Sequence, residues 1–232
     1  MVIIDVQQIT KTYNEKGTIP VHAVNGIDLQ IHEGEFSAIV GPSGCGKTTF
    51  LNLIGGLDKP NEGKVIINNQ DISRLKTNEL IDFRLHNIGF VFQSYNLIPV
   101  LTALENVAFI MELQGSPKKE RMARAQQLLE EVGIGDKGNY KPRELSGGQQ
   151  QRIAVARALA SRPKFILADE PTANLDSVST SELLDLMVEI NRKEQVTFVF
   201  ATHDKRVMDR ARRIITLTDG KITSDEKIDQ TY

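Results

Sequence analysis

Cysteine is nearly absent from this sequence of 232 residues, in which Cys45 is the single example. One thiol excludes an intrachain disulfide and any zinc or iron–sulfur site built from several cysteines, so we expect a reducing, cytoplasmic environment. Long apolar runs are missing too: no stretch approaches the roughly 20 residues that cross a bilayer, so we expect no direct membrane insertion. Residues 1–5 lack the basic start of a secretory signal, and we expect no export.

The sequence also lacks an excess of either charge. The formal net charge is -2 at pH 7, which gives no general reason to expect nucleic-acid binding. Hydrophobic residues make up 40% and charged residues 25%, so the composition is that of an ordinary globular protein and does not indicate disorder.

Short β-rich runs alternate with helical patterns along the chain, which predicts an α/β fold. The runs cover residues 36–40, 88–92, 164–169 and 197–201. Strands separated by helices form a mainly parallel sheet, whose ligands lie beyond the carboxyl ends of the strands. Upstream, Ile27, Leu29 and Ile31 alternate with polar residues before the turn Glu33-Gly34, which predicts an N-terminal antiparallel β section.

We interpret residues 1–232 as a single domain that carries a lobe. Its parts are a core at about 1–93 and 144–224, an inserted helical lobe at about 94–143, and a polar tail at 225–232 that we expect to fray. The apolar stripe of the lobe consists of Ala125, Leu128, Leu129 and Val132. Asp219-Gly220 predicts a hairpin near the end of the core.

A glycine-rich loop follows the run 36–40 and precedes a helical pattern that includes Thr49. It reads Gly41-Pro42-Ser43-Gly44-Cys45-Gly46-Lys47-Thr48 and matches the phosphate-binding pattern GxxxxGK[ST]. Glycines let backbone N–H groups approach phosphate oxygens, and the helix N-terminus favours the anion. Lys47 is expected to bridge the outer phosphates, and Thr48 to offer its hydroxyl to the Mg²⁺ that accompanies ATP. A plain turn with an incidental lysine is the disfavoured alternative.

The thiol of Cys45 has two interpretations. A nearby helix N-terminus and Lys47 favour a reactive thiolate that bound nucleotide would shield. Alternatively, the side chain replaces a serine and points into packed surroundings, as free cysteines usually do.

Two carboxylates, Asp169 and Glu170, end the apolar run 164–169, and strand alternation places their side chains on different faces. Asp169 suits the coordination sphere of Mg²⁺, and Glu170 suits a general base that activates water. Alone, such a pair is more often a helix cap or a solvated edge. The phosphate loop favours the functional interpretation.

A second glycine-rich helix start, Leu145-Ser146-Gly147-Gly148-Gln149, is also able to bind an anion. The pentapeptide resembles the signature of ABC-type ATPases, in which each subunit's signature completes the partner's phosphate site. This resemblance implies the ABC ATPase fold, with a P-loop NTPase core, and a homodimer that forms on ATP binding.

Other landmarks resemble the same family in order, and their roles are implied by that resemblance. Tyr13 is expected to stack on adenine, Gln93 to sense Mg²⁺ and the attacking water, and His203 to contact the terminal phosphate or Glu170. Asp176 belongs to a segment that crosses the dimer interface in the family. The alternatives are a core tyrosine, a surface glutamine and a structural histidine. Asn174 and Cys45 depart from the commoner family residues.

Residues 52–60, 89–93 and 96–99 resemble the subfamily that serves lipoprotein release, macrolide export and peptide-antibiotic resistance. The resemblance implies an ATPase at the inner face of the cell membrane that powers a separate integral membrane permease. Gln93 and residues 95–99 are expected to couple the ATP state to that permease, with Leu97 and Ile98 as exposed apolar residues. Cargo selectivity belongs to the permease, so the cargo cannot be read from this chain.

The sequence disfavours two other functions. A soluble ABC-type switch in translation or DNA repair would need a second cassette or a long coiled coil, and neither a repeat nor sustained heptads is present. A catalytically inactive regulatory module is disfavoured because Lys47, Asp169, Glu170 and His203 are all present.

Overall fold

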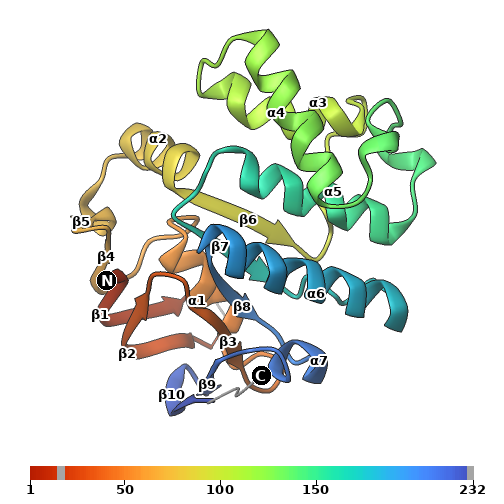
Figure 1. Ribbon diagram of the computed structural model, residues 1–232. Coiled ribbons are helices and arrows are strands. Elements are labelled where there is room, and N and C mark those ends of the chain that lie inside the picture. The colour runs from red at the N-terminus through yellow and green to blue at the C-terminus, as the bar shows by residue number, and fades with distance from the viewer. Residues whose placement is uncertain (15–18, 229–232) are drawn as a thin grey trace.

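Two β-sheets and a set of helices make up the computed structural model, which describes residues 1–14 and 19–228 (Figure 1). The first sheet is antiparallel and has the strand order β2-β1-β4-β5. Its strands are β1 (Val2–Tyr13), β2 (Val21–His32), β4 (Glu62–Ile67) and β5 (Gln70–Asp71). The predicted N-terminal antiparallel section is therefore confirmed.

The second sheet has six strands in the order β10-β9-β3-β8-β7-β6, and all neighbours are parallel except β10 and β9. Its strands are β3 (Phe36–Val40), β6 (Ile88–Phe92), β7 (Phe165–Asp169), β8 (Thr197–Ala201), β9 (Arg213–Thr218) and β10 (Lys221–Lys227). The four predicted runs form the continuous parallel part β3-β8-β7-β6, with β6 at the edge of the sheet, and Asp219-Gly220 makes the expected turn between β9 and β10.

Alternation along the central strands divides the core into two layers. Phe36, Phe198 and Phe200 point to one face, where their rings lie 4.7 to 5.9 Å apart between centroids. Ile39 and Val199 point to the other face, toward helix α1 and the antiparallel sheet. Both faces are buried, which explains why these strands read as continuous apolar runs.

Helices cover both faces of the six-stranded sheet. One side is covered by α5 (Gly147–Ala160) and α6 (Ser177–Glu194), whereas α1 (Lys47–Ile54) is packed between the two sheets (Figure 1). The shorter helical pieces are η1 (Ile72–Arg74), α2 (Thr77–Asn87), η2 (Gly135–Lys137), η3 (Pro142–Glu144) and α7 (Lys205–Met208). The phosphate loop thus connects a central strand to a helix that is held on both sides.

The segment after β6 is helical, with α3 (Ala103–Leu113) and α4 (Lys118–Glu131) above α5 (Figure 1). Thr102 caps α3 through a hydrogen bond from Glu105 N, and the Glu105 carboxylate returns to Thr102 N. The predicted stripe on α4 is buried against this layer. No helix of the described residues has both the length and the apolar character of a membrane span.

The expected fraying of the tail is wrong for residues 225–227, which extend β10. Arg213, only 8% exposed, donates to Asp225 through Nε and Nη2, at 2.8 Å each, and to Glu35 through Nη1. A buried guanidinium needs carboxylates around it, and one of them comes from this strand. Residues 229–232, the rest of the expected tail, lie outside the described residues.

Asp225→Asn should lower the free energy of unfolding by about 1 kcal/mol, because the neutral amide cannot accept both charge-assisted hydrogen bonds. Hydrogen bonds from Arg213 hold the pKa of Asp225 below its ordinary value. The stability it provides is present above the unfolded pKa of about 3.9 and is lost as pH falls through the folded pKa. Urea unfolding should therefore show a smaller loss at pH 3 than at pH 7. Exposed Glu226→Gln is the control, and an equal effect of both would contradict this role for Asp225.

Candidate functional site

The phosphate loop, residues 41–48, joins β3 to α1 and takes its path from glycine. Gly46 has a φ of +104°, and a Cβ there would lie 2.1 Å from the carbonyl oxygen of Ala23 on β2. No other residue type fits so close to backbone. Lys47 begins α1, and its ammonium donates to the carbonyl oxygens of Gly41 and Pro42 at 2.8 and 3.0 Å. A cation and free N–H groups therefore meet at one point, as an anionic ligand requires.

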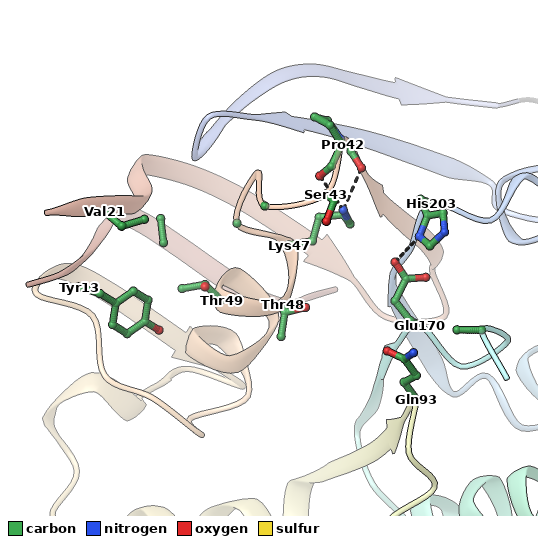
Figure 2. A pocket seen from close by; sticks show the side chains of 15 residues that line it. Tyr13, Val21, Pro42, Ser43, Lys47, Thr48, Thr49, Gln93, Glu170 and His203 are labelled. Atoms are coloured by element: carbon green, nitrogen blue, oxygen red, sulfur yellow. Dashed lines mark hydrogen bonds and ion pairs between the residues drawn. The ribbon is translucent and has the colours of Figure 1, made fainter. Parts of the chain in front are cut away.

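The loop forms one wall of a cleft of about 700 Å³ (Figure 2). The lining residues come from β1, β2, the loop, α1 and the ends of β6, β7 and β8. They are Tyr13, Val21, Ala23, Gly41, Pro42, Ser43, Gly44, Gly46, Lys47, Thr48, Thr49, Gln93, Glu170, Ala173 and His203. The fold thus brings together twelve of the residues singled out in the sequence, at the carboxyl ends of the strands.

Asp169 and Thr48 supply oxygen atoms beside the phosphate loop. Thr48 lines the cleft, whereas Asp169 lies behind it and is not among the described residues that line the cleft. The Thr48 hydroxyl donates to Asp169 Oδ1 at 3.1 Å. Burial raises the pKa of the Asp169 carboxyl, and the neighbouring Glu170 charge raises it further. Hydroxyl and carboxylate oxygens suit Mg²⁺, which usually completes its shell with water and substrate phosphates. No cluster of three or more His, Cys, Asp or Glu able to hold a metal occurs among the described residues.

Glu170 is held in an uncommon backbone conformation, with a φ of +44°. Thr202 Oγ1 donates to its Oε2 at 2.9 Å, and His203 Nδ1 lies 2.7 Å from its Oε1. Asp169 and Glu170 thus have different partners, as alternation predicts. Figure 2 shows the carboxylate of Glu170 directed at the exposed ring of His203, with Gln93 on its other side. A fixed carboxylate beside an imidazole can accept a proton from water.

Thr202 was not predicted as a site residue, although a hydroxyl residue next to a strand-end histidine was a usable signal. Val21 and Ala23, which line the cleft near Tyr13, were not predicted either. These two carry no motif, and only the pairing of β1 with β2, in which Tyr13 lies opposite Val21, places them there.

The second glycine-rich helix start lies apart from the cleft. Ser146 and Gln149 form a reciprocal cap at the start of α5: Ser146 Oγ accepts from Gln149 N, and Gln149 Oε1 accepts from Ser146 N. Gly147 and Gly148 form the first turn of the helix. None of these four is among the described residues that line the cleft. Within one chain, this helix start therefore does not contribute to the cleft.

Asp176 also lies outside the cleft and caps α6. Its Oδ1 accepts from Val178 N and Ser179 N at 2.9 Å, and its Oδ2 accepts from Ser179 Oγ at 2.7 Å. The cap lies close to the second helix start, since a Cβ on Gly148 would lie 3.2 Å from Ser179 Oγ. The two capped helix starts therefore share one surface.

Cys45 is only 4% exposed, and its side chain packs in the core layer around α1 rather than in the cleft. Its Sγ lies 4.0 Å from Lys47 Nζ. The structure favours the interpretation that the residue replaces a serine in packed surroundings, because a reagent cannot reach a thiol this deeply buried. The other interpretation, a reactive thiol shielded by nucleotide, is not supported, although the backbone of Cys45 remains part of the loop.

The segment after β6 differs from the expectation in one respect. Leu97 and Ile98 are half-buried, with Leu97 packed on the core and Ile98 hydrogen-bonded through its backbone to the Asn106 side chain. The exposed apolar residue is Val100, at 71%. Asn106, fully buried, satisfies this turn with its side chain, which is why the apolar residues before it face inward.

Comparison with known proteins gives consistent relationships. The family described as ABC transporter matches residues 24–173. The chain is 42% identical to the lipoprotein-releasing system ATP-binding protein LolD of Syntrophus aciditrophicus over 222 residues, 96% of this chain and 99% of LolD. It is 45% identical over 223 residues to the macrolide export ATP-binding/permease protein MacB of Marinobacter nauticus, covering 96% of this chain and 34% of MacB.

Among solved structures, the chain is similar to the ATP-binding cassette MJ0796 of Methanocaldococcus jannaschii, captured as a dimer in a post-hydrolysis state with ADP and Pi. The TM-score is 0.90 and the identity 44%, over 97% of this chain and 99% of that one. A likeness at this level extends to the whole fold, including both sheets and the helical layer.

Proposed function

The chain belongs to the ABC transporter family, and from this membership we propose that it dimerises around two ATP molecules with Mg²⁺ and drives a separate membrane permease. It is an ATP-hydrolysing, ATP-binding subunit related to the LolD and MacB systems. The observation that carries the proposal is the cleft itself, which combines a phosphate loop, a fixed carboxylate and an exposed histidine.

Within this cleft, each residue has a proposed task. The loop N–H groups and Lys47 bind the phosphates, and the face of Tyr13 stacks on the base. Thr48 and Asp169 would hold Mg²⁺, whose charge neutralises phosphate oxygens. Glu170 accepts the proton of the attacking water, Gln93 orients that water, and His203 holds the carboxylate and contacts the terminal phosphate.

We infer the dimer from two parts of each chain, a nucleotide cleft and a separate helix start, that can complete each other across two chains. Each chain has a cleft with one helix end at the phosphates, and a second helix end at Ser146 that has no ligand of its own. A two-fold axis brings the helix end of one chain to the cleft of the other, so that both sites are completed at once. Asp176 lies on the same surface and would meet the partner there. The dimeric state of the similar cassette with ADP and Pi supports this arrangement.

We propose that the helical lobe, about residues 94–143, contacts the permease at the cytoplasmic face of the membrane. Val100 is the apolar residue exposed at its start, directly after the turn that follows Gln93 and β6. A contact there would connect the catalytic cleft to a membrane partner through a short stretch of chain. The relatives named for lipoprotein release and macrolide export support an export or extrusion function.

Affinity purification tests whether the chain binds an integral membrane protein. The tagged chain, incubated with detergent-solubilised membranes of its source cells, should retain an integral membrane protein identifiable by mass spectrometry. Val100→Ser should reduce that retention severalfold, because a buried valine contributes about 1.5–3 kcal/mol. Ile228→Ser, at an exposed apolar residue after β10, is the control and should leave retention unchanged. Recovery of ribosomes or DNA-repair proteins in place of a membrane protein would favour the soluble switch.

A further inference from the structure

A group of charged side chains outside the cleft holds the hydroxyl of Tyr13. The Tyr13 hydroxyl donates to Asp58 Oδ2 at 2.8 Å. The other carboxylate oxygen, Asp58 Oδ1, accepts from Lys11 Nζ and from the backbone N–H of Lys59, at 2.7 Å each. Both oxygens of Asp58 are therefore engaged, and each partner has a defined direction.

Lys11 completes this group, which we call the tyrosine clamp (Lys11, Tyr13 and Asp58). Its ammonium also donates to the carbonyl oxygen of Lys59 at 2.8 Å and lies 5.1 Å from the centroid of the Tyr13 ring. The Lys11 side chain is 12% exposed, so these contacts replace most of its hydration. Opposite partial charges attract the ammonium to the ring face.

The clamp connects distant parts of the chain. Tyr13 ends β1, whereas Asp58 lies four residues after the end of α1, the helix that begins at the phosphate loop. The turn around Asp58 is itself fixed, since the N–H groups of Leu57 and Asp58 both donate to Asn52 O within α1. The clamp thus fixes the Tyr13 ring relative to α1, the helix that begins at the phosphate loop. Figure 2 shows Tyr13 at the far end of the cleft from Lys47.

An aromatic side chain attached only at its backbone can rotate about two bonds. Tyr13 ends its strand and is 42% exposed, so packing alone does not fix the ring. A hydrogen bond at the hydroxyl adds a second anchor at the opposite end of the side chain and fixes the direction of the ring axis. The Lys11 ammonium over the ring face favours one rotation of the ring about that axis. Ordering the ring before the ligand arrives removes that entropy cost from the binding step.

We propose that Asp58, held by Lys11, is a positioning residue that fixes the Tyr13 ring as a preformed stacking surface for the nucleotide base. The proposal rests on the proposed role of Tyr13 in base stacking and adds the residues that make the ring ready for it. Although burial of Asp58 raises its pKa, hydrogen bonds from Lys11 and Tyr13 lower the pKa overall, so the carboxylate that the clamp needs is charged at neutral pH.

A double-mutant cycle with MgADP tests the clamp, because ADP carries the base without hydrolysis. Isothermal titration should show about fivefold weaker binding for Asp58→Ala, which corresponds to the typical net contribution of one hydrogen bond. Tyr13→Ala should weaken binding about tenfold or more through lost stacking. Asp58→Ala should add nothing in the Tyr13→Ala background, because the clamp then has no ring to hold. With MgATP, Asp58→Ala should raise KM and leave kcat unchanged.

Contrary results would distinguish a failure of the clamp from a failure of base stacking by Tyr13. Unchanged affinity of Asp58→Ala together with weak binding by Tyr13→Ala would overturn the clamp and leave base stacking intact. Equal weakening by Asp58→Ala in both backgrounds would assign Asp58 a purely structural role. Unchanged affinity of Tyr13→Ala would overturn the stacking role, and the clamp with it.

Lys11→Met gives a second test if Asp58→Ala does not fold. This change keeps the Tyr13–Asp58 hydrogen bond and removes the ammonium, so MgADP binding should weaken about two- to fivefold, again only when Tyr13 is present. Lys59→Met is the matched control, because the Lys59 ammonium donates to Leu75 O outside the clamp. Equal effects of the two lysine changes would overturn the assignment.

Discussion

Glu170→Gln is expected to reduce ATP hydrolysis by about a hundredfold or more, the usual contribution of a general base. Glutamine preserves the shape of the side chain and can still accept the hydrogen bond from Thr202, but its amide cannot take a proton from water. Binding of ATP should persist, so the ATP-bound dimer should accumulate. Phosphate release measures the first effect, and sedimentation with Mg-ATP or Mg-ADP measures the second, with a dimer expected only for Mg-ATP.

The control for this prediction is Glu194→Gln, at an exposed carboxylate near the end of α6. It changes the net charge by the same amount and should affect neither hydrolysis nor assembly. A Glu170→Gln protein that remains monomeric in Mg-ATP would argue against shared sites. One that still hydrolyses ATP at the normal rate would remove Glu170 as the base.

Gly46→Ala is expected to lower the free energy of unfolding by about 3 kcal/mol or more and to abolish measurable nucleotide binding. Two costs combine at this position. The φ of +104° is unfavourable for any residue with a Cβ, and the new Cβ would lie 2.1 Å from the carbonyl oxygen of Ala23. Because that oxygen belongs to the backbone of β2, relief requires the loop or the strand to move. Urea unfolding and titration with MgADP measure the two effects.

Gly44→Ala in the same loop separates these costs. Gly44 has a φ of +79°, but a Cβ there would have no atom within 4 Å, so only the backbone strain of about 1 kcal/mol applies. We therefore expect a much smaller loss of stability without nucleotide than for Gly46→Ala. Similar losses for the two variants would mean that the contact with Ala23 does not limit the loop.

Patterns that depend on near neighbours could be predicted well. The strands at 36–40, 88–92 and 197–201 agree with β3, β6 and β8, because a strand buried on both faces leaves a short apolar run. The phosphate loop could be located because glycine spacing and the following lysine both serve the same ligand. The order of the strands in the sheet was not predicted, because long-range pairing leaves no local signal.

Features that depend on contacts between distant residues were missed or wrong. Asp58 and Tyr13 are 45 residues apart, and nothing near either of them indicates that they meet. The tail was expected to fray because it is polar. Asp225, however, accepts hydrogen bonds from the buried Arg213, a contact that the sequence near Asp225 does not reveal. Leu97 and Ile98 were expected on the surface, whereas the buried amide of Asn106 turns their segment inward.

The hydrogen bonds from Lys47 to the carbonyl oxygens of Gly41 and Pro42 bear on the release of nucleotide after hydrolysis. Lys47 is only 8% exposed, and its ammonium already donates to two carbonyl oxygens, so it has lost most of its water before a nucleotide enters. An ammonium has three N–H donors, so a phosphate finds one of them free of the loop carbonyls and gains a second only by replacing a hydrogen bond of the loop. The loop thus competes with its own ligand. With Lys47 in its proposed role at the phosphates, this competition lowers the affinity for ADP, which an ATPase must release after each cycle of hydrolysis.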